Sequence, residues 1–219
     1  MIKVLKKIGF VLIVLLGINC NAQIPAGTPV GGYTSAAEFK ANTPKYPAGL
    51  TVTKRSRTTI IMWGGNDYEV QSTDKSIKSS TIKKDIWGVY AQDTLYINAK
   101  PLTGYAGYTK VEVYGKYLFA RPAFPNYFTQ QKMGITSNSS STAAFGAAGG
   151  AISGAQKALA RLPLIYNTQT DEKMVLSKKE ILKLLESHSE LKMQYEAEPD
   201  MEAEVTLVSY LIKINELEK

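Results

Sequence analysis

The 219-residue sequence contains one cysteine, Cys20, and one histidine, His188. Thiol enzymes, zinc sites and disulfide frameworks all need more of these residues than the chain has. His188 lies between two serines with no neighbouring ligand or base, which favours a solvated helical position. We therefore expect no catalytic cysteine or histidine, no metal site and no cofactor.

The sequence also lacks the short motifs that carry enzyme chemistry. It has no Gly-x-Ser-x-Gly elbow, no phosphate-binding loop and no His-Glu-x-x-His motif. Carboxylates in or beside expected strands leave glycoside hydrolysis open; they are Asp67, Glu69, Asp85, Asp93 and Glu112. Turn positions account for two of these, Asp67 and Asp93, without catalysis. The sequence thus favours a non-enzymatic protein.

The N-terminus predicts export. Three lysines among the first seven residues precede an uncharged apolar run over 8–18, and small residues follow at 20–22. This is the pattern of a secretory signal peptide. The apolar run is too short for a membrane-spanning helix, which needs ~20 residues. We therefore expect residues 1–22 to be a cleaved signal rather than an anchor.

Two N-termini of the exported protein are open. Cleavage between Ala22 and Gln23 gives a soluble protein without cysteine, whereas acylation of Cys20 gives a lipoprotein. Asn19 is a poor residue to precede an acylated cysteine, so we favour cleavage after Ala22. Either form works in the cell envelope, in the periplasm or at the outer membrane.

Charge is divided along the chain. Residues 23–161 hold 16 Lys or Arg against 7 Asp or Glu, whereas residues 162–219 hold 7 against 12. The two parts could dock on one another, or the basic part could face anionic lipid. A moderately basic protein without either contact is the plainer interpretation.

Runs of β-forming residues predict an antiparallel sheet over 51–121. The run 51–70 includes strong β-formers at 58–63 and a turn after them, and 86–90 faces 94–98 across a three-residue loop, 91–93. A third run, 109–121, predicts a long strand with a bulge or bend at Gly115. We expect at least four strands.

Helix signals lie mainly on either side of this sheet. Ser35 with Glu38 and Ser177 with Glu180 each form a capping box, and 201–217 predicts an amphipathic helix. A second hairpin is expected from 164–167 and 173–176. The fold class is therefore α+β. The expected parts are the signal 1–22, a β-rich domain 23–133, a Ser-rich link with a Gly/Ala-rich helix 134–162, and a hairpin with C-terminal helices 163–219.

The Gly/Ala-rich segment predicts an interaction stripe. Gly146, Gly150 and Gly154 recur every four residues, and Ala147 and Ala151 do the same. On a helix such small residues allow close approach of a second backbone. Tight packing on the sheet, association with a partner or a second copy, and insertion into a membrane all fit this pattern, in that order of preference.

Clustered aromatics suggest a second kind of surface. Tyr105, Tyr108, Tyr114 and Tyr117 fall within a short stretch of the expected sheet. An exposed row of tyrosines stacks on sugar rings or forms a protein interface. The same residues are good strand formers, so core packing also explains them. Export argues against nucleic acid as the partner.

Several short motifs resemble, in the same order, an uncharacterised domain family of unknown function found in exported proteins of Bacteroidota-type bacteria. The motifs are Gly32-Tyr33-Thr34-Ser35, Glu38-Phe39, Asn42-Thr43-Pro44, Ile86-Trp87-Gly88-Val89-Tyr90, Leu95-Tyr96-Ile97-Asn98 and Gly115-Lys116-Tyr117-Leu118-Phe119. The resemblance implies export and no particular reaction.

These observations predict a non-enzymatic binding or scaffold component of the cell envelope. It would act through an envelope protein partner, self-association or membrane contact. The alternative is a glycan-directed protein, either a lectin-like module or a weak hydrolase, that uses the aromatic sheet face.

Overall fold

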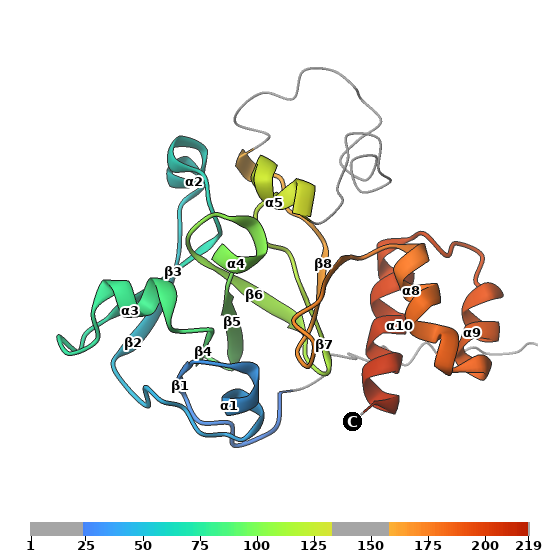
Figure 1. Ribbon diagram of the computed structural model, residues 1–219, viewed down its shortest axis with the longest axis horizontal. Coiled ribbons are helices and arrows are strands. Elements are labelled where there is room, and N and C mark those ends of the chain that lie inside the picture. Colours follow the sequence, from blue (N-terminus) through green and yellow to red (C-terminus); the bar gives the residue numbers. More distant parts are fainter. Residues whose placement is uncertain (1–23, 133–157, 219) are drawn as a thin grey trace, which may run out of the picture.

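The computed structural model describes residues 24–132 and 158–218. Nine strands alternate with short helices, and three longer helical segments follow (Figure 1). The strands are β1 Gly31–Tyr33, β2 Leu50–Lys54, β3 Tyr68–Ser72, β4 Gly88–Ala91, β5 Thr94–Asn98, β6 Tyr108–Val113, β7 Tyr117–Ala120, β8 Leu164–Asn167 and β9 Lys173–Val175. The helices are α1 Ala36–Lys40, α2 Arg57–Trp63, α3 Ser79–Lys84, α4 Lys100–Thr103, α5 Tyr127–Lys132, α8 Lys178–Leu184, η1 Leu185–Ser187, α9 Ser189–Glu196 and α10 Glu204–Leu217.

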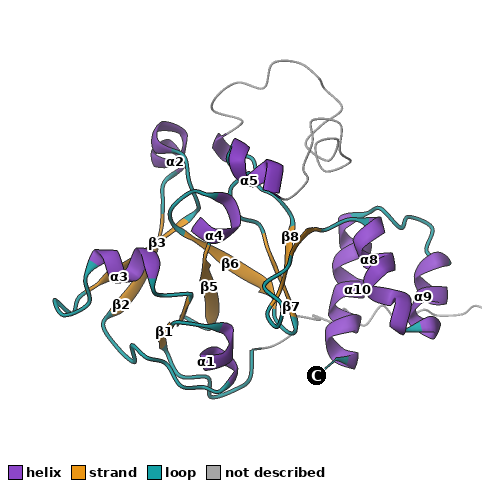
Figure 2. Ribbon diagram, in the orientation of Figure 1, coloured by secondary structure: helices purple, strands orange, loops and turns teal. Residues whose placement is uncertain are grey.

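All nine strands join one antiparallel sheet, so the α+β class is confirmed. Seven of them follow the order β1-β4-β5-β6-β7-β8-β9, and the β2–β3 ribbon joins through β3 and β6. Figure 2 shows the strands in orange and the helices in purple. The sheet therefore extends beyond the predicted range 51–121. Strand β8 lies C-terminal to the expected boundary at residue 163 and pairs with β7 along its whole length.

Both predicted hairpins are present. The β4–β5 connection has two residues, Gln92 and Asp93, rather than the expected three. Both have positive φ, at 52° and 53°, as tight hairpin turns require. The β8–β9 hairpin spans residues 164–175, as the sequence indicates.

The expected single strand over 109–121 is wrong. The chain instead makes a further hairpin, β6–β7, with a register shift between Val111 and Val113. Gly115 lies in its turn, where a Cβ atom would come within 2.8 Å of the Cβ atom of Asn215 in α10. The glycine thus marks a bend, as predicted, and leaves room for the helix.

The strand expected at 58–63 is also wrong, because these residues form α2. The Ser56 hydroxyl accepts a hydrogen bond from the Thr59 N–H at 3.1 Å and caps the helix start. Gly64, with φ of +63°, ends the helix. Strands β2 and β3 pair with each other on either side, so 55–67 is their connection. The two caps and this pairing override the β propensity of the run.

The serine half of each predicted capping box is confirmed, while the Glu38 carboxylate accepts from the N–H of Thr34 at 2.7 Å instead of that of Ser35. Ser35 accepts from the Glu38 N–H and begins α1, and Ser177 accepts from the Glu180 N–H and begins α8. The last amphipathic helix begins at Glu204, three residues later than the pattern indicates.

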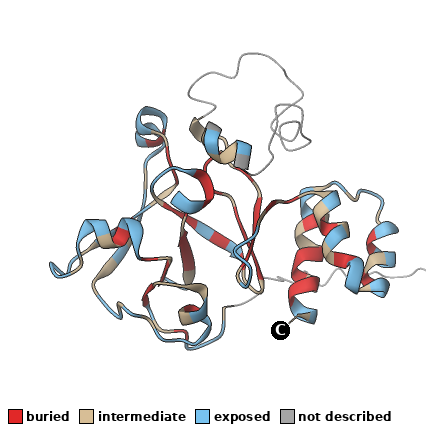
Figure 3. Ribbon diagram, viewed as in Figure 1, coloured by how far each residue is buried: buried red, intermediate tan, exposed pale blue. Residues whose placement is uncertain are grey.

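Three clusters of buried residues hold the molecule together. One cluster fills the space between α1 and the central strands, and a second lies between the β2–β3 ribbon, α3 and strands β4–β6. The third joins β7, β8 and β9 to α8, α9 and α10, which lie together at one side of the sheet (Figure 1). Burial accordingly follows the central strands and the inner faces of the C-terminal helices (Figure 3).

Asn215 ties α10 to the sheet. Its side-chain amide accepts a hydrogen bond from the Tyr117 N–H and donates one to the Tyr117 carbonyl, both at 2.8 Å. These are the two bonds that a neighbouring strand would make, so Asn215 satisfies the backbone of β7 where no strand is available. The C-terminal helices are therefore fixed relative to the sheet.

Candidate binding cleft

A cleft of about 630 Å³ opens where the β2–β3 ribbon leaves the main sheet. Strand β3 pairs with β6 only at Tyr68 and Tyr108, and then diverges from it. The diverging strand, the end of α2, α3 and the segment 105–108 surround the cleft, which we call the β3 cleft. Its shape thus follows from the sheet topology.

Tyr108 fixes the floor of the β3 cleft. The side chain is 3 % exposed, and its hydroxyl donates to the carbonyls of Ile82 at 2.6 Å and Ile86 at 3.3 Å. These bonds tie the end of α3 to strand β6. Burial raises the pKa of the Tyr108 phenol far above its ordinary value, so the group remains a neutral donor.

Asn66 organises the rim between the two loops that carry exposed aromatic rings. The residue is fully buried, and its Nδ2 donates to the carbonyls of Tyr105 at 3.1 Å and Ala106 at 3.2 Å. Its Oδ1 accepts from the Ala123 N–H at 2.8 Å. One amide therefore holds three segments of the chain together.

Arg55 fixes the same rim from the end of β2. Its Nη1 donates to the carbonyls of Gly64 at 2.8 Å and Asn66 at 2.9 Å. Gly65, with φ of +89°, leaves no room for a side chain, because a Cβ atom would lie 2.9 Å from Arg55 Nη1. These contacts therefore hold the turn after α2 in a defined conformation.

Two aromatic rings border this rim and are exposed. Trp63 is 79 % exposed at the end of α2, and Tyr105 is 40 % exposed beside the Asn66 amide. Tyr68 contributes a third ring, which packs against Tyr96 with centroids 4.7 Å apart. Large apolar side chains are seldom left in water next to a well-ordered cleft unless they contact something.

The β3 cleft carries an excess of positive charge. Arg55, Lys83 and Lys100 line it, against one carboxylate, Glu69. Amide and hydroxyl side chains supply the rest of the polar lining, notably those of Gln71 and Asn98. The cleft can therefore bind a polar molecule that carries negative charge and has an apolar face.

The four tyrosines of the predicted aromatic face do not lie together. Tyr105 and Tyr108 line the β3 cleft, although Tyr108 is buried in its floor. Tyr114 is half-buried against Phe39, and Tyr117 is buried in the cluster under the C-terminal helices. The four rings therefore do not form one exposed row, and Trp63 takes the place of Tyr114 and Tyr117 beside the cleft.

Tyr114 borders a different groove of about 770 Å³, between the sheet and α10. Residues 24–27, strand β6 and the α10 residues Val208 and Ile212 line it. Two carboxylates, Asp93 and Glu112, line it, and Glu112 pairs with Arg121, which also pairs with Glu204 of α10. This groove lacks the exposed aromatic rings of the β3 cleft, so we do not take it as the primary site.

The predicted interaction stripe lies outside the described residues. It consists of Gly146, Ala147, Gly150, Ala151 and Gly154. Cys20, which the less favoured lipoprotein alternative would acylate, lies outside the described residues too. These hypotheses therefore stay predictions.

His188 lies between η1 and α9, and its Nε2 is 3.2 Å from the Glu218 carboxylate. Glu218 also pairs with Lys116 in the β6–β7 turn. Burial alone would raise the pKa of Glu218, but the hydrogen bonds from Lys116 and His188 outweigh it and hold the pKa below its ordinary value. The three side chains join the C-terminus of α10 to the sheet.

The described residues carry no sign of two other kinds of site. Within 24–132 and 158–218, no helix has the length and apolar character needed to cross a bilayer. In the same residues, no cluster of three or more His, Cys, Asp and Glu side chains could hold a metal ion.

The sequence indicates Trp63 as a candidate aromatic but places it in a strand, and it places Asn66 in an ordinary turn. The helix end that carries Trp63 and the role of Asn66 in positioning the rim therefore emerge from the structure alone. A serine at 56 and a glycine at 64 could have marked the ends of a helix between them. No local pattern in the sequence indicates that Asn66 reaches the distant segments around Tyr105 and Ala123.

The fold and the site together define an α+β protein with an open, basic, aromatic-bordered cleft on a divergent β-ribbon. The chain belongs to the family of unknown function DUF6563, whose model matches residues 31–218. This match spans the β3 cleft and the C-terminal helices. No curated protein and no solved structure matches the chain.

Proposed function

We propose that this protein is a non-enzymatic binding protein of the bacterial cell envelope, and that the β3 cleft binds carbohydrate. The observation that carries the proposal is the pair of exposed rings, Trp63 at the end of α2 and Tyr105 in the segment that the buried Asn66 amide holds in place. The signal peptide predicted for 1–22 and the resemblance to exported Bacteroidota-type proteins support the compartment.

A sugar ring suits the lining of this cleft. Pyranose rings have an apolar C–H face that packs on aromatic rings, and hydroxyl groups around the edge that need hydrogen-bond partners. The cleft offers rings at its border and the side chains of Gln71 and Asn98 within. Since Asn66 and Arg55 fix the rim, little ordering entropy is lost on binding.

The carboxylates of the cleft favour binding over hydrolysis. Most glycoside hydrolases use two carboxyl groups on opposite sides of the scissile bond, at most about 9.5 Å apart. Glu69 is the single carboxylate in the lining of the described cleft. Asp67 lies nearby but is engaged by Arg161, which binds its carboxylate through Nε at 3.1 Å.

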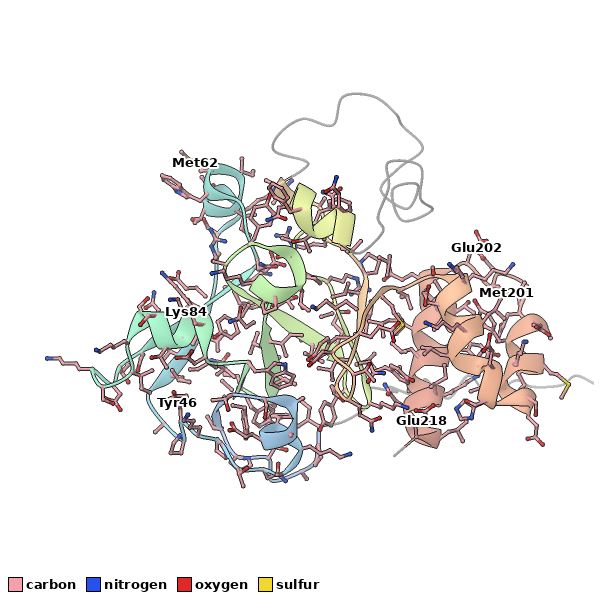
Figure 4. All side chains as sticks on the ribbon, viewed as in Figure 1. Tyr46, Met62, Lys84, Met201, Glu202 and Glu218 are labelled. Atoms are coloured by element: carbon pink, nitrogen blue, oxygen red, sulfur yellow. The ribbon has the colours of Figure 1, made fainter. Side chains whose placement is uncertain are left out.

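A glycan array followed by titration calorimetry tests this proposal. We expect binding that Trp63→Ala and Tyr105→Ala each weaken by about ten-fold, because each removes a stacking ring worth ~1–1.5 kcal/mol. Met62→Ala is the matched control. Met62 is 70 % exposed on the outside of α2 but does not line the cleft (Figure 4). An array without hits, or hits that both ring variants retain, would contradict the proposal.

A protein partner docked on α2 is the second candidate. Ile61, Met62 and Trp63 are consecutive and exposed, which is unusual for a surface helix without a partner. This candidate predicts the opposite outcome for the control: Met62→Ala would weaken capture of an envelope protein, whereas Tyr105→Ala would leave it unchanged. Met62→Ala and Tyr105→Ala therefore distinguish a carbohydrate ligand from a protein partner.

The compartment needs its own test. Intact-mass analysis and fractionation of the native protein should give a soluble envelope protein that begins at Gln23. A diacylglyceryl mass on Cys20 would instead identify a lipoprotein, and a cytoplasmic protein that retains residues 1–22 would contradict export.

A further inference from the structure

The positive end of the β3 cleft is built around Asn98. The side-chain Nδ2 of Asn98 donates to the carbonyl of Lys83 at 3.2 Å, and its Oδ1 accepts from the N–H of Lys100 at 3.1 Å. A single amide thus joins the backbone at the end of α3 to the backbone at the start of α4. Two lysines from separate elements are brought to the same side of the cleft.

Neither ammonium group serves a visible structural purpose there. Within the part of the chain that the structure describes, the basic side chains that contact a carboxylate are Lys116, Arg121, Arg161, Lys183 and His188, and neither Lys83 nor Lys100 is among them. Both lysines line the cleft, and among the described residues neither ammonium group has a carboxylate partner. An anion bound in the cleft would supply this counter-charge.

The aromatic rings and these lysines belong to the same cleft but enter it from different elements. Trp63 and Tyr105 come from the rim that Asn66 fixes, and Lys83 and Lys100 from the clamp that Asn98 forms. Tyr108 joins the two parts, since its hydroxyl bonds the carbonyl of Ile82, next to Lys83. The cleft therefore offers stacking rings and unpaired cations to one ligand.

On the basis of the proposed function, we propose that the β3 cleft selects acidic glycans. Sugar rings stack on Trp63 and Tyr105, while an anionic group of the same glycan binds between Lys83 and Lys100. The shared chemistry is an oxyanion on a sugar, which uronic acids supply as carboxylate and sulfated glycans as sulfate. A neutral glycan leaves both lysines without a partner and binds more weakly.

The test uses an array that pairs each acidic glycan with a neutral counterpart of the same backbone, such as oligogalacturonate with its methyl ester. We expect hits among the acidic members, weakened when NaCl is raised from about 50 mM to about 500 mM. Carboxylated and sulfated members form separate arms that identify the source of the charge. A single-stranded oligonucleotide of similar charge should bind poorly.

Variants then locate the charge. Lys83→Gln and Lys100→Gln should each weaken binding roughly five-fold, and together roughly twenty-fold, as expected for partly exposed charge pairs. The Asn98 clamp uses backbone atoms of both lysines, so these substitutions leave it intact. Lys84→Gln is the matched control, because Lys84 is an exposed neighbour on α3 that does not line the cleft (Figure 4); its effect should stay below about two-fold.

The outcomes are distinguishable. Neutral and acidic members that bind equally, or acidic binding that the double variant retains, overturn the charge selection and leave the carbohydrate proposal standing. Equal binding of the oligonucleotide identifies a general polyanion surface and also overturns it. An array without hits overturns the proposed function and this inference together.

Discussion

Asn66→Ala should destabilise the protein by about 3 kcal/mol. The substitution removes the bonds from Asn66 Nδ2 to the Tyr105 and Ala106 carbonyls, and the bond that Oδ1 accepts from the Ala123 N–H. Ala106 keeps a second donor, the Asn66 N–H at 3.3 Å. A hydrogen bond contributes ~1 kcal/mol, and a buried group left without a partner costs ~1–3 kcal/mol. The buried Ala123 N–H, left without its acceptor, contributes most of the expected loss of about 3 kcal/mol. The lost bond to the Tyr105 carbonyl contributes most of the rest, because the Ala106 carbonyl keeps a donor.

Urea denaturation followed by tryptophan fluorescence measures this loss, and a thermal melt should show a midpoint lower by roughly 8 °C. Asn66→Asp keeps the acceptor for Ala123 but sets a second oxygen against two carbonyls, so it should cost at least as much. Gln194→Ala, which removes an exposed amide on α9, is the control and should stay within about 0.5 kcal/mol. A loss below about 1 kcal/mol for Asn66→Ala would refute the role assigned to this amide.

Three further predictions concern the C-terminal half. Gly115→Ala should cost about 1–3 kcal/mol in urea denaturation, because the new Cβ atom would lie 2.8 Å from that of Asn215; an unchanged midpoint would contradict this packing. Ser177→Ala should cost about 1 kcal/mol by removing the cap of α8, and a neutral effect would show that the cap is dispensable. Because the folded-state pKa of Glu218 is lowered, its contribution is complete above the ordinary value of 4.5 and is lost as the pH falls through the folded-state pKa. The stability difference between the wild type and Glu218→Gln should therefore shrink on acidification, and a constant difference in pH-dependent melts would contradict the pairing.

Local signals predicted the parts of the fold that local interactions determine. The capping serines Ser35 and Ser177 each satisfy a helix start within four residues, so the sequence displays them directly. The β4–β5 hairpin also depends on neighbours, and its apolar runs face each other as expected. The addition of β8 to β7 joins residues more than forty apart, and no short pattern specifies that pairing.

Short sequence signals could not predict the candidate cleft either, because the residues that form it are also far apart in the sequence. Tyr105 was identified as a binding residue from composition, but its position depends on Asn66, which is 39 residues away. At the other end of the cleft, the Asn98 side chain bonds to the backbone of Lys83 and of Lys100, which lie before and after the β4–β5 hairpin in the sequence. A side-chain amide that bonds to a distant backbone group produces no periodic pattern in the sequence. Such contacts can therefore be recognised only in the structure.

The clearest failure of the sequence reasoning supports the location of the site. Residues 58–63 have side chains that favour strands, yet they form α2, and three of the helix's apolar side chains face water. Sequences normally agree with their structure at every level, and violations concentrate where function demands them. Selection for stability alone would replace Ile61, Met62 and Trp63 by polar helix formers at no cost to the core, since Ile60 is the buried residue of α2. Of these three side chains Trp63 lines the β3 cleft, so a ligand in the cleft would explain its exposure, whereas exposed Ile61 and Met62 fit the second candidate, a partner docked on α2.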